Sequence, residues 1–389
     1  MQQERMRAGS QRMPRGSAEG GPLVKTNGID NEELSKVLNR LGEAAVNPEA
    51  WRGIMDDICK AVGASAALLL QSDIRTPDVP RTDSIAEATD LYFRNNWHLR
   101  DPRARGFPRM MAGEVVTDFD VMTPEQIRAD PMYNEVLFPF GYRWFAGIGF
   151  WADSAAWALT LQRTGREGTF EARDKQLLAQ LAPRLTETAT LATAVGRAAL
   201  SSMTDVLDRV RQPALVLNRE GMVLRTNQMA DHGFDAEIRI RGRRLLLRDK
   251  HAMTRFDQLV SMIRSTPDAA AIAASPILVR RTTKPPVVLR LLPVDGAARS
   301  VFLGARALLI LSNLSPRPAP DPALIGQAFD LTPAESRLAA LLATGTSIAD
   351  AADHLRISRE TARNHLKSIF SKTGIHRQSE LVTLVSQLG

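Results

Sequence analysis

The sequence predicts a multidomain α+β protein, in which two units built around antiparallel sheets precede an all-α unit of four helices. Three observations support this fold class. The chain has 389 residues, which is more than one ordinary hydrophobic core accommodates, and 44% of them are hydrophobic. Helical and strand-like segments alternate as far as residue 314. After the proline-rich segment SPRPAPDP at residues 315–322, only helical periodicity remains.

The first unit is expected over residues 29–198, after a patternless tail at residues 1–28 that composition predicts to be disordered. A helix begins near Asp30, and a second helix follows the turn at residues 47–48. The segment ASAALLLQ at residues 64–71 is typical of a short buried strand.

A hairpin and a long helix complete this unit. The runs YRWFAGIGFWA and AAWALTLQRT predict two strands joined at Asp153-Ser154. A long helix then follows, with Thr169 as a candidate N-cap and an interruption or kink at Pro183. Helices around a central antiparallel sheet are typical of a sensor domain of the GAF kind.

The second unit is expected over residues 199–314. Five strand-like runs surround short helices within about 110 residues, which is a PAS-like pattern. The basic run RIRGRRLLLRDK at residues 239–250 is interpreted as a solvated strand pair or dimer surface rather than a second nucleic-acid site. Residues 315–326 are expected to be an extended linker.

The third unit, residues 327–389, carries four consecutive helix signals. Thr332 can cap the first helix, with Pro333 at its first position and Glu335 completing a capping box. Ser347 can cap the second helix, and Ser358 the third. RQSELVTLVSQL predicts the fourth. Two short helices joined by the tight connection RIS, of which the second is longer and basic, describe a helix-turn-helix.

The third helix, within SRETARNHLKSIFSKTG, has two chemically different sides. At about 100° per residue, one sector contains Arg359, Arg363, Asn364 and Lys367, and the opposite one is mainly apolar. A merely solvated face usually alternates basic with acidic residues. Here the only acid in the polar sector is Glu360. Arginine, asparagine and lysine are also the residues that read base edges in the major groove. The face therefore favours duplex DNA over solvent or a protein partner.

These residues also carry a family resemblance. The segment LTPAESRLAALLATGTSIADAADHLRISRETARNHLKSIFSKTGIHRQSEL resembles the LuxR-type DNA-binding domain across the whole helical unit. Ala362 and Ala351 stand where the family usually has valine and isoleucine. The resemblance implies a bacterial transcription factor that binds DNA as a homodimer, with RNA polymerase as a further candidate partner. It assigns base contacts to Arg363, Asn364 and Lys367, and phosphate contacts to Arg359, Thr361 and Lys372.

A second resemblance concerns ligand sensing. YFRNNWHLRDPRARG is similar to a segment of autoinducer-binding domains, in which an aspartate accepts a hydrogen bond from a lactone's amide and aromatic residues pack on the ligand. It implies ligand contacts by Tyr92, Trp97 and Asp101, and Trp144 is a further candidate from the same aromatic-rich unit. The alternatives remain that Asp101-Pro102 only turns the chain, that the aromatic residues form a core, and that the ligand is another small molecule.

Other classes of function find little support. A net charge of +7 suits a polyanion. The lone Cys59 cannot form an internal disulfide or a cysteine-rich metal site. No metal motif is formed by His354, His365 and His376, and no cofactor is expected. No apolar run reaches membrane length and no signal peptide is recognised, so a cytoplasmic protein is expected. Enzyme motifs are absent. A helical interaction scaffold, or an enzyme with a regulatory module, remains the alternative.

Overall fold

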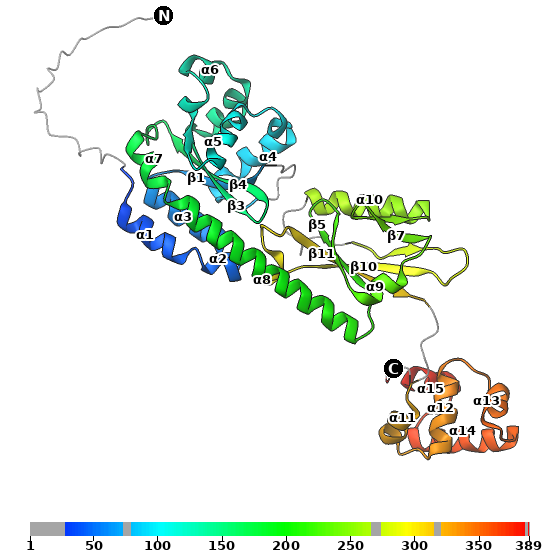
Figure 1. Cartoon of the computed structure of the whole chain (residues 1–389). Helices are drawn as coiled ribbons and strands as arrows, with labels where there is room; N and C mark the ends of the chain where they lie inside the picture. The colour runs from blue at the N-terminus through cyan, green and yellow to red at the C-terminus, as the bar shows by residue number, and fades with distance from the viewer. Residues whose placement is uncertain (1–27, 73–78, 266–273, 315–319, 386–387, 389) are drawn as a thin grey trace, which may run out of the picture.

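The structure is a computed structural model that describes residues 28–72, 79–265, 274–314, 320–385 and 388 (Figure 1). It is a mixed α+β fold with antiparallel sheets, followed by a helical C-terminal unit, and the predicted fold class is thereby confirmed. The tail predicted at residues 1–28 lies outside the described residues except for Gly28. Residues 315–319 of the predicted linker also lie outside them.

A four-stranded antiparallel sheet with strand order β1-β4-β3-β2 organises the first unit. Its strands are β1 (Ala66–Gln71), β2 (Val115–Thr117), β3 (Tyr142–Ala152) and β4 (Ala155–Thr164). The predicted hairpin of β3 and β4 is confirmed, and Asp153 adopts the left-handed conformation at its turn (φ 53°). Consecutive residues of β1 and β4 are buried, so both faces of the sheet are covered.

Helices supply this cover. One face packs against α3 (Ala50–Val62) and α8 (Leu181–Arg209), and α1 (Asn31–Arg40) and α2 (Glu43–Val46) pack on these two helices around the same core. The other face packs against α4 (Ala86–Arg94), α5 (Phe107–Met111) and the helical turn η5 (Tyr133–Leu137), with α6 (Pro124–Ala129) beside η5. The helix predicted near Asp30 is confirmed. Its N-cap is Asp30, whose carboxylate accepts hydrogen bonds from the backbone N–H groups of Glu32 and Glu33.

The helical pattern after Thr169 is divided differently from the prediction. Glu171 rather than Thr169 is the N-cap of α7 (Ala172–Leu178). The helix ends at Leu178, and α8 begins at Leu181. Pro183 lies in the first turn of α8, where a backbone N–H has no partner within the helix, so proline costs no hydrogen bond. The interruption predicted at Pro183 is therefore wrong. α8 also continues across residues 198 and 199, and so contributes to both sheet-containing units.

A five-stranded antiparallel sheet with strand order β6-β5-β11-β10-β9 organises the second unit. Its strands are β5 (Ala214–Asn218), β6 (Val223–Thr226), β9 (Ile277–Val279), β10 (Val287–Pro293) and β11 (Ala305–Asn313), accompanied by α9 (Gln228–Gly233) and α10 (Lys250–Ser265). The basic run forms the hairpin of β7 (Ile238–Arg241) and β8 (Arg244–Leu247), which confirms the predicted strand pair. Its apolar residues pack into the core while its arginines are exposed.

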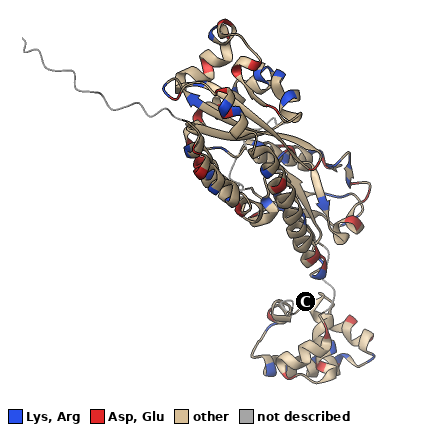
Figure 2. Ribbon diagram, turned by 60° about the vertical axis from the view of Figure 1, so that its left-hand side comes forward, with Lys and Arg blue, Asp and Glu red and all other residues tan. Residues whose placement is uncertain are grey.

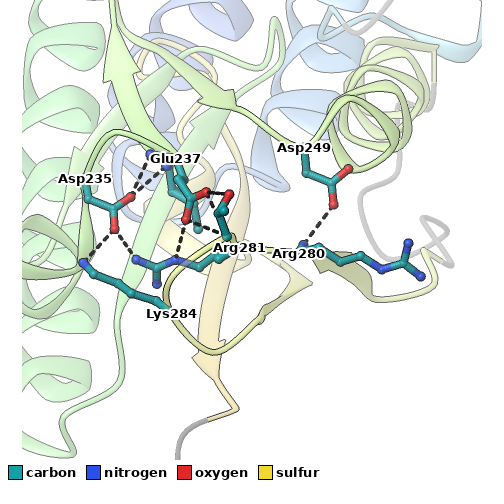
Figure 3. A network of polar contacts seen from close by, with 8 residues as sticks. Asp235, Glu237, Asp249, Arg280, Arg281 and Lys284 are labelled. Carbon is teal, nitrogen blue, oxygen red and sulfur yellow. Dashed lines mark hydrogen bonds and ion pairs between the residues drawn. The ribbon is translucent and has the colours of Figure 1, made fainter.

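Charged side chains tie the β9–β10 connection to the segment that precedes β7 (Figure 3). Arg281, whose side chain is buried, forms ion pairs with Asp235 and Glu237, and Lys284 Nζ lies 2.7 Å from Asp235 Oδ2. Glu237 also accepts hydrogen bonds from the backbone N–H and the hydroxyl of Thr282. Burial raises the pKa of the Asp235 carboxyl, but its hydrogen bonds and the neighbouring cations outweigh burial and leave that pKa below the usual range.

An aromatic side chain of the second unit packs into the core of the first. Phe302 follows the turn η8 (Gly296–Arg299) and lies edge-on to Trp51, Phe150 and Trp157, with ring centroids 5.6, 5.9 and 5.1 Å away. Edge-to-face geometry at this spacing is favourable for aromatic pairs. Phe302 therefore links the two sheet-containing units through a shared core.

The C-terminal unit has five helices in its described part rather than the four predicted. They are α11 (Pro322–Phe329), α12 (Pro333–Ala343), α13 (Ile348–Leu355), α14 (Arg359–Thr373) and α15 (Gln378–Val385). The additional helix α11 occupies part of the interval predicted as linker. Asp321 caps it and Pro322 takes its first position. The start signals predicted for the next three helices are confirmed, since Thr332, Ser347 and Ser358 are their N-caps.

Candidate nucleic-acid interface and ligand cavity

α13 and α14 form a helix-turn-helix whose connection has a defined geometry. Arg356 adopts a left-handed conformation (φ 55°) and ends α13, and the backbone N–H of Ile357 donates to the Ala352 carbonyl at 3.0 Å. Ser358 then caps α14, because its hydroxyl accepts from the backbone N–H of Thr361 at 3.0 Å. Local hydrogen bonds thus fix where α14 starts.

Packing fixes which side of α14 faces outward. Ala362, Leu366 and Ile369 are buried against α12 and α13. The opposite side presents the predicted residues Arg359, Arg363, Asn364 and Lys367, all of them exposed. Thr361 is half-buried, and its hydroxyl lies 2.8 Å from that of Ser358. The polar sector expected from the sequence therefore forms one exposed surface, which we call the α14 face.

The α14 face is predominantly basic. α14 contains four basic residues and one acidic residue, Glu360. Arg363 lies 4.0 Å from Glu360, but the two side chains are 67% and 74% exposed, and ion pairs of this kind contribute little. Figure 2 shows basic and acidic positions in all three units. The exposed arginines of the β7–β8 hairpin form a second basic segment, so a local excess of positive charge is not unique to α14.

Lys372 differs from the other predicted contacts because its partner is a nearly buried carboxylate on another helix. Its Nζ lies 2.9 Å from Oε2 of Glu335, the capping-box residue of α12. Burial raises the pKa of the Glu335 carboxyl, but hydrogen bonds from Ser368, Lys372 and Thr332 outweigh burial and lower that pKa to about 2. The ion pair thus fastens the end of α14 to the start of α12.

A cavity lies in the first unit between the sheet and the helices α4 and α5. It consists of two adjoining spaces of about 110 and 30 Å³ that share Leu70, Tyr92, Arg103 and Thr160 in their walls. Tyr92 and Asp101, two predicted ligand contacts, line the larger space. Trp97 and Trp144 line neither space.

The two tryptophans are placed by packing. Trp97 is buried in the core beside α4, with the Arg100 guanidinium 3.8 Å from its ring centroid. Trp144 contacts Phe119 at 5.5 Å and packs against the core on the far side of the sheet. Successive residues of a strand point to opposite faces, and here Phe145 is the one that faces the cavity. Trp97 and Trp144 therefore do not line the cavity with Tyr92 and Asp101, although Trp97 and Tyr92 pack in the same core.

Asp101 is fully engaged by its neighbours. Its carboxylate accepts hydrogen bonds from the backbone N–H of Arg103, from the Arg103 guanidinium (2.7 Å from Nη2 to Oδ2) and from the Tyr92 hydroxyl (2.9 Å). Burial raises the pKa of Asp101, but the Arg103 guanidinium outweighs burial and leaves that pKa below the usual value. Asp101 also caps the turn η3 (Pro102–Gly106), so it turns the chain in addition to lining the cavity.

Two further cavity residues were not predicted from the sequence. Arg103 and Gln162 are 9% and 2% exposed. Neither Nη1 of Arg103 nor Oε1 of Gln162 has a hydrogen-bond partner within the described part of the chain. Arginine and glutamine are usually exposed, so nothing in the sequence pattern marks these two as buried.

Other kinds of site were also considered. In the described ranges, no group of three or more His, Cys, Asp or Glu side chains is placed to hold a metal ion. None of the helices within those ranges combines the length and apolarity that a membrane crossing requires. Cys59 is buried, and burial raises the pKa of its thiol to about 12, so it is not a reactive thiolate.

Comparison with known proteins gives a sequence match for the C-terminal unit. Residues 330–385 match a family model described as bacterial regulatory proteins of the luxR family. No curated protein matches the chain at a significant level.

Solved structures show only low similarity to the chain. The ligand-binding domain of VqsR from Pseudomonas aeruginosa is 18% identical, with 41% of this chain and 94% of that chain covered and a TM-score of 0.33. The phage VqmA–DPO complex is 15% identical, with 50% and 91% covered and a TM-score of 0.20. The Escherichia coli DhaR(N)–DhaL complex is 12% identical, with 78% and 94% covered and a TM-score of 0.20.

Proposed function

We propose, from the premise that residues 330–385 are a helix-turn-helix domain of the LuxR family of bacterial regulatory proteins, that this chain is a ligand-responsive transcription factor. It binds a specific duplex DNA sequence through α14, and its first unit binds a small molecule that alters this activity. A factor that acts on bacterial DNA works in the cytoplasm.

The α14 face is the observation that carries the proposal. Arg363, Asn364 and Lys367 are exposed on the side of α14 opposite its packed residues, where they can reach base edges in a major groove. Arg359 and Thr361 lie in the first turn of α14, where phosphate contacts position such a helix on the backbone. We assign Lys372 a weaker phosphate contact, because it is shared with Glu335.

We infer a dimer because one α14 helix contacts only a short stretch of the major groove. One short helix covers too little of the groove for strong specificity, whereas two copies read half-sites about one helical turn apart. The apolar residues Leu381 and Val385 of α15 are buried within the C-terminal unit, so they are not available to a second copy. α8 is therefore the preferred surface, since Leu191 and Val206 are about half exposed on it. Analytical ultracentrifugation of the full chain distinguishes a dimer from a monomer and so tests whether the protein dimerises.

Sensing is assigned to the cavity of the first unit. Ligand pockets are mainly apolar with a few placed polar groups, and this cavity combines Leu70, Met110 and Phe145 with Arg103 and Gln162. A ligand preferred by one arrangement of the units shifts the population toward that arrangement, and with it the spacing of the two α14 helices.

Selection of DNA from a random pool by the full chain tests the proposal. The wild type should enrich one sequence with two similar half-sites. Replacing Arg363 and Lys367 by alanine should abolish this enrichment, because it removes two groups that contact bases. Lys60→Ala with Arg128→Ala is the matched control. It removes two positive charges that are 78% and 70% exposed in the first unit, and should leave enrichment intact.

The alternatives give different outcomes. A protein-interaction scaffold, or an enzyme with an appended module, would enrich no sequence and would be indifferent to Arg363 and Lys367. Enrichment that both double variants lose equally would indicate non-specific attraction by net charge rather than reading by α14.

A further inference from the structure

The hairpin of β7 and β8 carries three arginines on its outward side. Ile238 and Leu245 are buried in the core of the second unit. Successive residues of a strand point to opposite faces, so Arg239 and Arg241 lie on the outer side of β7. The strand register places Arg244 of β8 directly opposite Arg241, on the same side. Arg239, Arg241 and Arg244 are all exposed, and we call them the ribbon face.

The positive charge of the ribbon face is not balanced within the described part of the chain. None of its three side chains forms an ion pair or a hydrogen bond with a described residue. The nearest acids along the chain are engaged elsewhere (Figure 3). Glu237 accepts hydrogen bonds from Thr282 and pairs with Arg281. Asp249 accepts from the backbone N–H of Arg280 at 2.9 Å.

Arg241 and Arg244 form a cross-strand pair of like charge. Side chains directly opposite each other in an antiparallel pair have Cβ atoms about 5 Å apart, and like charges in this position destabilise the hairpin. An acidic residue at either position would instead give a favourable pair. An anion that lies over both guanidinium groups removes the repulsion. The ribbon face is therefore suited to an anionic partner.

The chemistry of the ribbon face distinguishes between anionic partners. Guanidinium groups bind phosphate through two parallel hydrogen bonds. Single-stranded nucleic acid is bound largely by stacking on aromatic side chains, and residues 238–247 include none. A membrane surface requires apolar side chains that insert, but the apolar residue of this side, Leu246, is half-buried. A second copy docked by two-fold symmetry would bring arginine against arginine. Duplex phosphates fit best.

We infer that the ribbon face binds backbone phosphates of the duplex that α14 reads, outside the base pairs that α14 contacts. This inference rests on the proposed function and adds a second contact with the same DNA. Because both surfaces belong to one chain, binding through α14 raises the effective concentration of the duplex at the ribbon face. Phosphate contacts carry no sequence information, so the ribbon face strengthens binding to all sequences alike.

Salt titration of duplex binding by the full chain tests the inference. Fluorescence anisotropy gives the Kd for a duplex of the sequence enriched by the full chain and for a duplex of scrambled sequence. The triple variant Arg239→Gln, Arg241→Gln, Arg244→Gln removes the ribbon charges. Each phosphate contact contributes about 0.9 to the salt slope, so the slope should fall by about 2.7 for each bound chain. Between about 50 and 200 mM salt, the wild type should then lose about 40-fold more affinity than the variant. The ratio of the two affinities should not change.

A matched triple variant controls for net charge. Arg105→Gln with Arg166→Gln and Arg173→Gln removes three exposed arginines of the first unit and should leave the salt slope unchanged.

A single substitution separates binding from folding. Arg241→Glu places opposite charges across the hairpin, so it should melt no lower than the wild type by circular dichroism. It also repels phosphate, and should therefore weaken duplex binding more than Arg241→Gln does.

Three outcomes would overturn the inference. They are an unchanged slope in the ribbon variant, an equal fall in the matched control, and ribbon-dependent binding that is stronger to a single strand of equal length or to phosphatidylserine vesicles than to the duplex. DNA selection is scored separately. Enrichment with an unchanged slope overturns only the ribbon contact, and a ribbon-dependent slope on the scrambled duplex without enrichment overturns only sequence reading by α14.

Discussion

The ion pair between Glu335 of α12 and Lys372 of α14 leads to a quantitative prediction about stability. Glu335 is 6% exposed at its side chain, and its Oε2 accepts hydrogen bonds from Lys372 Nζ at 2.9 Å and from the backbone N–H of Thr332 at 2.7 Å. Glu335→Gln keeps the size of the side chain and an acceptor for the cap, because glutamine also forms a capping box. It removes only the negative charge that faces Lys372.

The pKa of Glu335 sets the magnitude. Lowering that pKa from 4.5 to about 2 corresponds to about 3 kcal/mol of stability at neutral pH. Lys372 is 35% exposed, so solvent screening reduces the expected loss in Glu335→Gln to about 2 kcal/mol. A carboxyl with a depressed pKa stabilises the folded state above its unfolded pKa. The stabilisation is therefore complete above about pH 5 and disappears as the pH falls toward 2.

Hydrogen exchange followed by mass spectrometry is the suitable assay. All tryptophans and tyrosines precede residue 158, so intrinsic fluorescence does not report on the C-terminal unit. At pH 7, amides of α12 and α14 in Glu335→Gln should exchange with an opening free energy about 2 kcal/mol below that of the wild type. At pH 3 the difference should be much smaller. Glu360→Gln, the same change at an exposed position on α14, is the control and should alter neither value.

Unchanged exchange in Glu335→Gln at pH 7 would refute this reasoning and leave Lys372 free for DNA. The two roles of Lys372 can also be separated by salt titration of DNA binding. A full phosphate contact predicts that Lys372→Met lowers the salt slope by about 1. A side chain held mainly by Glu335 predicts a smaller change.

Three further predictions concern the sheet-containing units. Phe302→Ala should lower the free energy of unfolding by about 2 kcal/mol, measured by urea titration, because it removes a half-buried ring from contact with its aromatic neighbours. Asp118 is buried, which raises its pKa to about 6, so its contribution to stability should fall by about 2 kcal/mol as the pH rises from 4 to 7 in urea titrations followed by fluorescence. Arg281→Met should lower the opening free energy for amide exchange in β9 and β10, because Asp235 and Glu237 lose a cationic partner whose side chain is 5% exposed.

Each of these has a matched comparison. Phe119→Ala removes a ring that is 48% exposed and should cost less than Phe302→Ala; an equal cost would argue against the packing of Phe302 between the units. Asp118→Asn should remove the fall in stability between pH 4 and 7, and persistence of that fall would assign it to another group. Arg280→Met lies next to Arg281 but outside the ion pairs, so equal effects of the two variants would contradict the network.

Local signals were the part of the fold that the sequence predicted well. The N-caps Thr332, Ser347 and Ser358 and the turn at Asp153 depend on hydrogen bonds within a few residues, and all were predicted correctly. α11 was missed although Asp321-Pro322 is a readable start signal, because the prolines before it favoured a linker.

Errors arose where a short segment allows more than one arrangement. Proline occurs both in the first turn of a helix and at kinks within a helix, so the pattern around Pro183 did not decide between these two positions. Strand alternation places Trp144 and Phe145 on opposite faces, but both faces of this sheet are buried. Nothing in the strand itself says which face borders the cavity. Only the structure shows that Phe145, and not Trp144, lines the cavity.

The sequence by itself determined where the C-terminal helices begin and that α14 has one basic and one apolar side, since helical periodicity and capping depend on neighbouring residues. Only the tertiary structure decided that Lys372 meets Glu335, 37 positions away, and that Arg103 and Gln162 are buried in one cavity. The physical reason is that burial and the partner of a charge are set by segments distant in the chain. Such contacts leave no periodic trace in the sequence around the residue.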